Sequence, residues 1–291
     1  MPLDTSKIKL PKSVALELSG KVKATSTIAA LSKPIPQLFA DKDYMIFNGA
    51  SEAEVIGEGK HIGSYDQPIT SVAGKRFKVV TTTRVSRELT WADKDARTEI
   101  VKAIIMDQAE SLGRALDFVC YHAINPKDGK SLDGFKALTS DAVSVTATSD
   151  AVADVDKLTD ALIDYDINGF ALSRPYASEL RKIRVPATGQ RLYPEIPLSL
   201  ELGNFDGITA ACSGTVDAKK AETATKVKGI IGDFNKIRWG MVRDIFGEMI
   251  ETGDPDGAGD LKRLDQVAYR TEAMFSYAVL DPKAFAVLKT A

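Results

Sequence analysis

The clearest pattern of apolar and polar positions in this chain runs from Val267 to Val279. The odd-numbered positions read Val, Tyr, Thr, Ala, Phe, Tyr and Val, whereas the even-numbered positions include the polar residues Arg270, Glu272 and Ser276. This alternation predicts a β-strand with one buried face, roughly 43 Å long at the usual rise per residue. A second alternating segment, "RFKVVTTTRVS", predicts another strand from Phe77 to Val85. Both strands are long for a globular protein.

A helical repeat of apolar residues lies between these strands in the sequence. One apolar stripe with charged residues opposite predicts a helix from about Asp95 to Ala123, roughly 40 Å long. Thr90, followed three residues later by Asp93, resembles a capping box at its start. Asn125–Pro126 is expected to end it.

Residues 141–235 mix helices and strands. "VADVDKLTDALIDYD" predicts an amphipathic helix, "NGFALSR" a short strand and "PYASELRKIR" a second helix. The Pro- and Gly-rich residues 185–207 predict a surface loop, and "KVKGIIGDF" begins a β-rich section. Asp281 before Pro282 then predicts a short helix over "PKAFAVL". Together these elements predict an α+β fold.

The beginning of the chain lacks a compact pattern. Residues 1–48 predict an extended arm, and residues 53–86 predict a long hairpin that returns through the alternating strand. An isolated two-stranded hairpin is only marginally stable in water. Because no part of the hairpin's own sequence supplies cover, we expect identical neighbouring subunits to cover it, which predicts an obligate oligomer.

Composition and charge narrow the class of protein. Hydrophobic residues make up 44% and charged residues 27%, as in soluble globular proteins. No apolar run approaches the ~20 residues that span a bilayer, so no membrane partner is expected. A net charge of -2 and a pI of about 5.9 disfavour a dedicated nucleic-acid binder. However, residues 1–33 hold six lysines, Lys21 and Lys23 among them, against two acidic residues, so this basic arm should meet an acidic partner subunit or nucleic acid.

An acidic stretch, "EMIETGDPDGAGDLKRLDQ", raises the question of a calcium site. Its weak candidate ligands are Asp254, Asp256, Asp260 and Asp265. An EF-hand loop requires an oxygen ligand at its fifth position, where Ala258 stands, and a helix after the loop. Since a strand is predicted there instead, we favour a glycine-rich turn between two long strands.

Other candidate chemistry is sparse. The two cysteines and two histidines lie far apart in sequence, without zinc-ligand spacing. "GEGKHIG" is one residue too long for a dinucleotide fingerprint and opens no helix. Nucleophile-elbow and Walker patterns are absent from the sequence. We therefore predict no catalytic residues and no cofactor.

The order of these elements resembles the major capsid proteins of tailed double-stranded DNA bacteriophages, which have the Hong Kong 97-type fold. The most recognisable parts are the "GDF" segment, the long strand and the closing "DPKAF". The resemblance divides the chain into an N-terminal arm (1–48), an extended loop (49–88), a peripheral domain with a spine helix (89–140), an axial domain (141–235), and the returning peripheral strands with the C-terminal segment (236–291).

The resemblance also implies a function and partners. The family's subunits assemble as hexamers and pentamers into an icosahedral shell around the genome. The resemblance implies a virion protein assembled in the host cytoplasm, with a separate scaffolding protein, a portal, decoration proteins and packaged DNA as partners. The implied inter-subunit contact residues are Lys60, His61, Tyr65, Lys75 and Arg76 in the loop, and Lys21 and Lys23 in the arm.

Two alternatives remain open from the sequence. An encapsulin, a bacterial compartment of the same fold, usually begins with a helical segment, whereas this chain begins with a lysine-rich arm. A cytosolic homo-oligomeric enzyme predicts a small closed oligomer and a pocket with convergent titratable groups.

Overall fold

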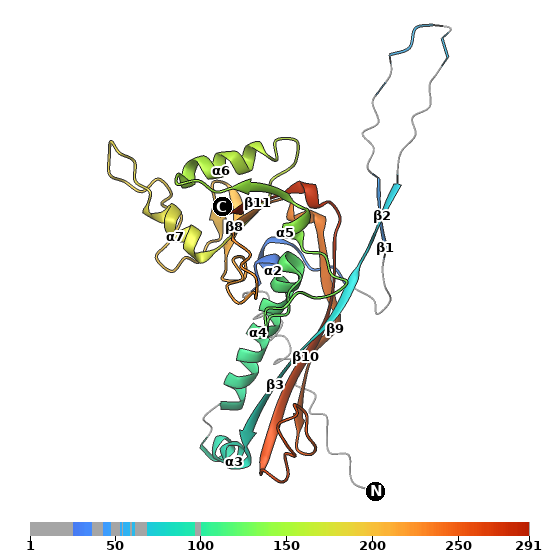
Figure 1. Ribbon diagram of the computed structural model, residues 1–291, viewed down its shortest axis with the longest axis vertical. Coiled ribbons are helices and arrows are strands. Elements are labelled where there is room, and N and C mark those ends of the chain that lie inside the picture. The colour runs from blue at the N-terminus through green and yellow to red at the C-terminus, as the bar shows by residue number, and fades with distance from the viewer. Residues whose placement is uncertain are drawn as a thin grey trace.

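The structure is a computed structural model in which residues 26–36, 43–47, 53, 55–58, 60–61, 69–96 and 100–290 are described. Figure 1 shows a long narrow sheet with helix α4 (Ile100–His122) beside it, a second sheet with its own helices, and a hairpin that projects from the body. The mixed helix and sheet content agrees with the α+β prediction.

The long sheet has the strand order β3-β10-β9, with both pairs antiparallel. Its strands are β3 (Lys75–Ser86), β9 (Ile237–Ile250) and β10 (Gln266–Val279). The strand predicted from Val267 is therefore confirmed, and it is the central strand of this sheet. Its odd-numbered side chains from Val267 to Tyr277 are buried, as the alternation predicts.

The helix predicted from about Asp95 to Ala123 corresponds to α4, and a further helix, α3, precedes it. Helix α3 (Arg87–Ala96) begins directly after β3, and α4 (Ile100–His122) follows. The predicted capping box at Thr90 is wrong because Thr90 lies inside α3; the Ser86 hydroxyl instead accepts a hydrogen bond from the amide of Leu89 at 3.3 Å.

Helix α4 ends before the predicted proline stop. Ala123 adopts a positive φ of 52°, the left-handed conformation that terminates many helices. The amide of Ile124 then donates to the carbonyl of Phe118 at 3.3 Å. Cys120, on the buried side of α4, is fully covered. No helix in the described part of the chain is long and apolar enough to cross a membrane.

The second sheet has the strand order β4-β11-β8-β5-β7-β6. Helices α6 (Ala151–Asp160) and α7 (Arg174–Lys182) lie on one face, with α6 over β4 and β11 and α7 over β8. Both helices, and the strand after α6, confirm the sequence predictions. The six strands are β4 (Val143–Thr146), β5 (Gly169–Leu172), β6 (Asn204–Phe205), β7 (Ile208–Cys212), β8 (Val227–Gly232) and β11 (Phe285–Lys289).

The helix predicted over "PKAFAVL" is wrong. Pro282–Ala284 forms one 3-10 turn, η2, and β11 follows it into the middle of the six-stranded sheet. Ala286 and Leu288 face one apolar cluster, whereas Phe285 and Val287 face the other. A strand buried on both faces reads as a continuous apolar run, which resembles a short buried helix in sequence.

The predicted hairpin exists with different strands. Its strands are β1 (Asp43–Phe47) and β2 (Ile69–Ala73), so its first strand lies inside the segment predicted as the arm. The strand predicted from Phe77 is part of β3 and pairs with β10. Only Gly74 separates β2 from β3, so the second strand of the hairpin continues almost directly into an edge strand of the long sheet.

Candidate functional site

The β1–β2 hairpin presents large apolar side chains to solvent. Met45 is 74% exposed and Ile69 60% exposed, and these two residues come from opposite strands of the ribbon. Figure 1 shows the ribbon extending beyond both sheets. Exposed apolar residues on a two-stranded ribbon, which is marginally stable by itself, are typical of a surface that binds another molecule.

The predicted contact residues fall on and near this ribbon. Lys60 and His61 are exposed between β1 and β2. Lys75 is exposed at the first position of β3, and Arg76 beside it is partly buried. Lys21, Lys23 and Tyr65 lie outside the described residues. Their contacts with other subunits stay a prediction.

A buried carboxylate fixes the chain ahead of the hairpin. Asp117 on α4 is fully buried and faces the start of the short helix α2 (Thr27–Leu31). Its Oδ1 accepts hydrogen bonds from the Ser26 hydroxyl at 2.5 Å and the Ile28 amide at 3.2 Å. Its Oδ2 accepts from the Thr27 amide and hydroxyl, both at 2.9 Å, and from the Thr215 hydroxyl at 2.6 Å.

This network binds three separate segments together. Burial raises the pKa of Asp117, while hydrogen bonds from Ser26, Thr215 and Thr27 act in the opposite direction. Five donors satisfy the carboxylate without a cation. Sequence reasoning missed Asp117, although a lone carboxylate beside Leu116 on the apolar stripe is the signal that could have revealed it.

The segment after α2 continues along β9. The Ser32 hydroxyl donates to the carbonyl of Ile237 at 3.0 Å, and the Trp239 indole donates to the carbonyl of Ser32 at 3.2 Å. The amide of Ile35 donates to the carbonyl of Trp239 at 2.8 Å. Residues 26–36, which the sequence assigned to an extended arm, are therefore bound to the body of the subunit, and Ser26, Thr27, Ile28 and Ser32 are buried there.

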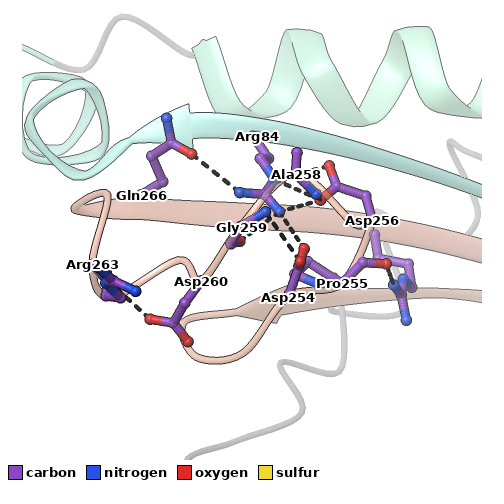
Figure 2. A network of polar contacts seen from close by, with 10 residues as sticks. Arg84, Asp254, Pro255, Asp256, Ala258, Gly259, Asp260, Arg263 and Gln266 are labelled. Atoms are coloured by element: carbon purple, nitrogen blue, oxygen red, sulfur yellow. Dashed lines mark hydrogen bonds and ion pairs between the residues drawn. The ribbon is translucent and has the colours of Figure 1, made fainter.

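The acidic turn between β9 and β10 is held by an arginine. Figure 2 shows Arg84 of β3 reaching into the turn. Its Nε lies 2.7 Å and 2.8 Å from the two carboxylate oxygens of Asp256, and its Nη2 lies 2.8 Å from Asp254 and 2.9 Å from the carbonyl of Gly259. These hydrogen bonds lower the pKa of Asp256 below its ordinary value.

The four candidate calcium ligands do not converge. Asp254 and Asp256 bind Arg84, Asp265 pairs with Arg87 at 3.3 Å, and Asp260 accepts from the amide of Arg263 at 3.0 Å. Among the described residues, no group of three or more His, Cys, Asp or Glu side chains is arranged to hold a metal ion. The prediction of a turn joining two long strands is confirmed, and Arg84 is the residue that sequence reasoning missed.

The "GDF" and "DPKAF" segments meet at the junction of the two sheets. The amide of Asp233 donates to the carbonyl of Ala284 at 3.1 Å, and Gly232 pairs with Phe285. The side chain of Asn168 donates to the Asp233 carboxylate and accepts from the amide of Phe234 at 2.8 Å. Both recognisable segments therefore serve one structural joint.

One surface hollow bears on the enzyme alternative. About 500 Å³ in volume, it gathers the cations Arg114, Lys219 and Lys220 beside Ser213 and Thr215. Among the described residues that line it, none is a carboxylate, histidine or cysteine that could serve as a base or thiol nucleophile. Nearby, the His122 ring Nε2 lies 3.2 Å and 3.0 Å from the carbonyls of Thr215 and Val216, and burial lowers its pKa to about 4. His122 therefore holds this loop as a neutral donor.

Comparison with known proteins identifies the family. Residues 8–290 match the Phage capsid family. The chain belongs to the phage capsid family. A search of curated protein sequences gave no match.

Solved structures agree with this assignment. A structure from Mycobacterium phage Ogopogo is 32% identical, with a TM-score of 0.81, and the match covers 92% of each chain. One from Gordonia phage Cozz is 26% identical, with a TM-score of 0.77, covering all of this chain and 91% of that chain. The capsid of an empty GTA particle, at 16% identity, a TM-score of 0.64 and coverage of 92% of this chain and 90% of that chain, shares the fold.

These matches confirm the resemblance drawn from the sequence. They support a major capsid protein of an icosahedral bacteriophage capsid, with the Hong Kong 97-like fold. Family membership implies a non-enzymatic structural protein that self-assembles into shells and resides in the virion. The boundaries of the arm, loop, peripheral and axial regions stay a prediction, although β11 joins the sheet of the predicted axial region rather than the long sheet.

Proposed function

We propose that this protein assembles as hexamers and pentamers into the icosahedral head that encloses the double-stranded DNA of a phage. The single observation that carries this proposal is the projecting β1–β2 ribbon. Exposed Met45 and Ile69 require cover, and the ribbon's position beyond its own sheets leaves that cover to a neighbouring copy.

The anchored segment supports the same proposal. Because the Asp117 network fixes Ser26 and Thr27, residues 1–25 start from a defined point on each subunit. This portion contains five lysines, so it suits an acidic neighbour or the packaged DNA, contacted without sequence specificity. A separate scaffolding protein, a portal and decoration proteins are further partners in this proposal, with assembly in the host cytoplasm.

Replacing the ribbon tests the proposal. Asp43 and Ala73 are paired at its base, so residues 44–72 can be exchanged for a short Gly-Ser linker without displacing β3. Negative-stain electron microscopy and sedimentation of the wild-type chain, with and without its scaffold, should show shells, tubes or rings of five or six subunits. The linker variant should remain a folded monomer.

Circular dichroism and thermal unfolding of the linker variant provide the folding control. A wild-type chain that stays monomeric or dimeric under every condition would count against the shell. Normal assembly of the linker variant would instead show that the β1–β2 hairpin is not required for assembly.

A further inference from the structure

The six-stranded sheet carries two charged faces of opposite sign at separate places. The acidic face consists of Asp160, Asp164 and Asp166, at the end of α6 and in the turn after it; all three are exposed. The basic face consists of Arg181, Lys182, Arg184 and Arg191, at the end of α7 and in the small hairpin that follows. Lys182 and Arg184 are exposed, and the other two are partly buried.

These charges have no ion-pair partner among the residues that the structure describes. None of the seven side chains forms an ion pair or hydrogen bond with another residue in the described portion of the chain. The Nε atom of Arg181 is buried without a hydrogen-bond partner there. Glu179, the carboxylate nearest in sequence to the basic face, is already paired with Lys228 at 2.8 Å. Both faces are therefore available to an outside partner.

Exposed apolar residues lie close to each face in the sequence. Ile163, between Asp160 and Asp164 in the sequence, is 82% exposed, and Tyr165 lies beside it. Leu192 follows Arg191 and is exposed, and Leu198 further along the same loop is 80% exposed. Apolar residues rimmed by charge are typical of protein interfaces.

The two faces lie on different parts of the sheet. The Tyr176 hydroxyl of α7 donates to the carbonyl of Ala151 at 3.2 Å, so α6 starts against α7. The acidic face lies at the other end of α6, roughly 15 Å away along the helix axis. The basic hairpin continues toward β6, where the ring of Tyr193 lies 4.9 Å from that of Phe205. In Figure 1 the loop after α7 projects on the side of the molecule opposite to the β1–β2 hairpin.

Both faces are held in shape by the backbone. In the acidic turn, the amide of Tyr165 donates to the carbonyl of Leu162 at 2.9 Å. In the basic hairpin, the amide of Val185 donates to the carbonyl of Gln190 at 2.9 Å, and that of Leu192 donates to the carbonyl of Ile183 at 3.1 Å. Preformed faces lose little conformational entropy on binding.

We propose that the acidic face of one subunit binds the basic face of the next subunit in a ring. Two different, complementary faces on one chain make a head-to-tail contact, and such a contact generates a ring when its rotation closes. The partner is a second copy because each face finds its opposite charge and a matching apolar centre on this same chain. This inference rests on the proposed shell function and identifies the contact within each pentamer or hexamer.

Charge reversal provides the main test. Asp164→Lys with Asp166→Lys, or Arg184→Glu with Arg191→Glu, should each reduce the assembled fraction at least tenfold at physiological salt, because like charges then face each other. Combining all four substitutions restores opposite charges and should recover at least half of the wild-type assembly. Asp107→Lys with Asp133→Lys, which alters exposed carboxylates outside this sheet by the same net charge, should assemble normally.

Cysteine crosslinking tests the contact without reversing charge. A chain carrying both Asp164→Cys and Arg184→Cys should form, on mild oxidation, a ladder of crosslinked species that ends at five or six subunits. Each single-cysteine variant serves as the background control. The ladder is expected only if the two faces meet head to tail.

The outcomes separate this inference from the proposed function. Failure of the wild-type chain to form rings or shells would overturn the proposed shell-forming function. Wild-type assembly together with normal assembly of both reversed variants, or with no ladder from the double-cysteine chain, would overturn this contact while leaving the shell function intact. Failure of the fourfold variant to recover, with its thermal unfolding unchanged, would also overturn the pairing.

Discussion

Gly232 lies directly against Ala284: a Cβ atom at position 232 would stand 2.2 Å from the carbonyl oxygen of Ala284. Gly232 also has a φ of 155°, a backbone conformation that residues other than glycine rarely adopt. Gly232→Ala should therefore lower the free energy of unfolding by about 2–3 kcal/mol. Urea denaturation measures the change.

Gly203→Ala is the matched control for this prediction. A Cβ at Gly203 meets open space, and its φ is not in the glycine-favoured region. If the two variants are equally stable, the prediction is wrong. The backbone near Ala284 would then move enough to accommodate a Cβ atom at position 232.

Loss of the Asp117 carboxylate should loosen the segment that precedes the hairpin. In Asp117→Asn, an NH₂ group replaces one carboxylate oxygen. The Thr27 and Ile28 amides donate to different oxygens of Asp117, so at least one of them loses its acceptor. We expect a loss of about 3 kcal/mol in unfolding free energy and faster hydrogen exchange at residues 26–32. Asp107→Asn, exposed on the same helix, should change neither quantity.

Arg84 should control the shape of the acidic turn. Arg84→Lys retains a positive charge but loses the fork that binds Asp254 and Asp256 together. We expect faster hydrogen exchange and proteolysis within residues 251–265, and a rise in the pKa of Asp256 toward its ordinary value, measured by NMR titration. An unchanged turn in the lysine variant would mean that charge alone, without the fork, holds these carboxylates.

His122 should make the subunit sensitive to acid. Burial lowers its pKa from 6.5 to about 4, so the unfolded chain binds the extra proton first as pH falls. Stability from this residue is present above pH 6.5 and is lost progressively down to about pH 4, by about 3 kcal/mol in total. His122→Gln should show a smaller loss of stability between pH 7 and pH 4 in denaturant titrations. Parallel pH profiles for the two proteins would assign the acid sensitivity to other groups.

Regular periodicity accounts for the parts of the fold that were predictable from the sequence. The alternation around Phe275 and the apolar stripe through Leu116 each depend on one buried face, so neighbouring residues reveal them. The strand that begins at Phe285 was misread because burial on both faces removes the alternation. The hairpin was misplaced because pairing between Asp43 and Ala73 is a long-range property that neither segment shows alone.

The functional residues were harder to predict for the same reason. Asp117 and Arg84 act on residues about ninety and one hundred and seventy positions away. A lone polar residue in a sequence does not reveal which distant donors or acceptors will reach it. The acidic turn could be recognised from its glycines, but the arginine that compensates its charge could be found only in three dimensions.

The order of the strands has a consequence for synthesis of the protein. β10 enters the long sheet between β3 and β9, and β11 enters the other sheet between β4 and β8. On the ribosome, neither sheet can close until residues 266–289 have emerged, although β3 and β4 were made long before. A chain broken off before this point lacks the middle of both sheets. Only a chain that is synthesised through β10 and β11 can therefore complete both sheets and fold into a subunit.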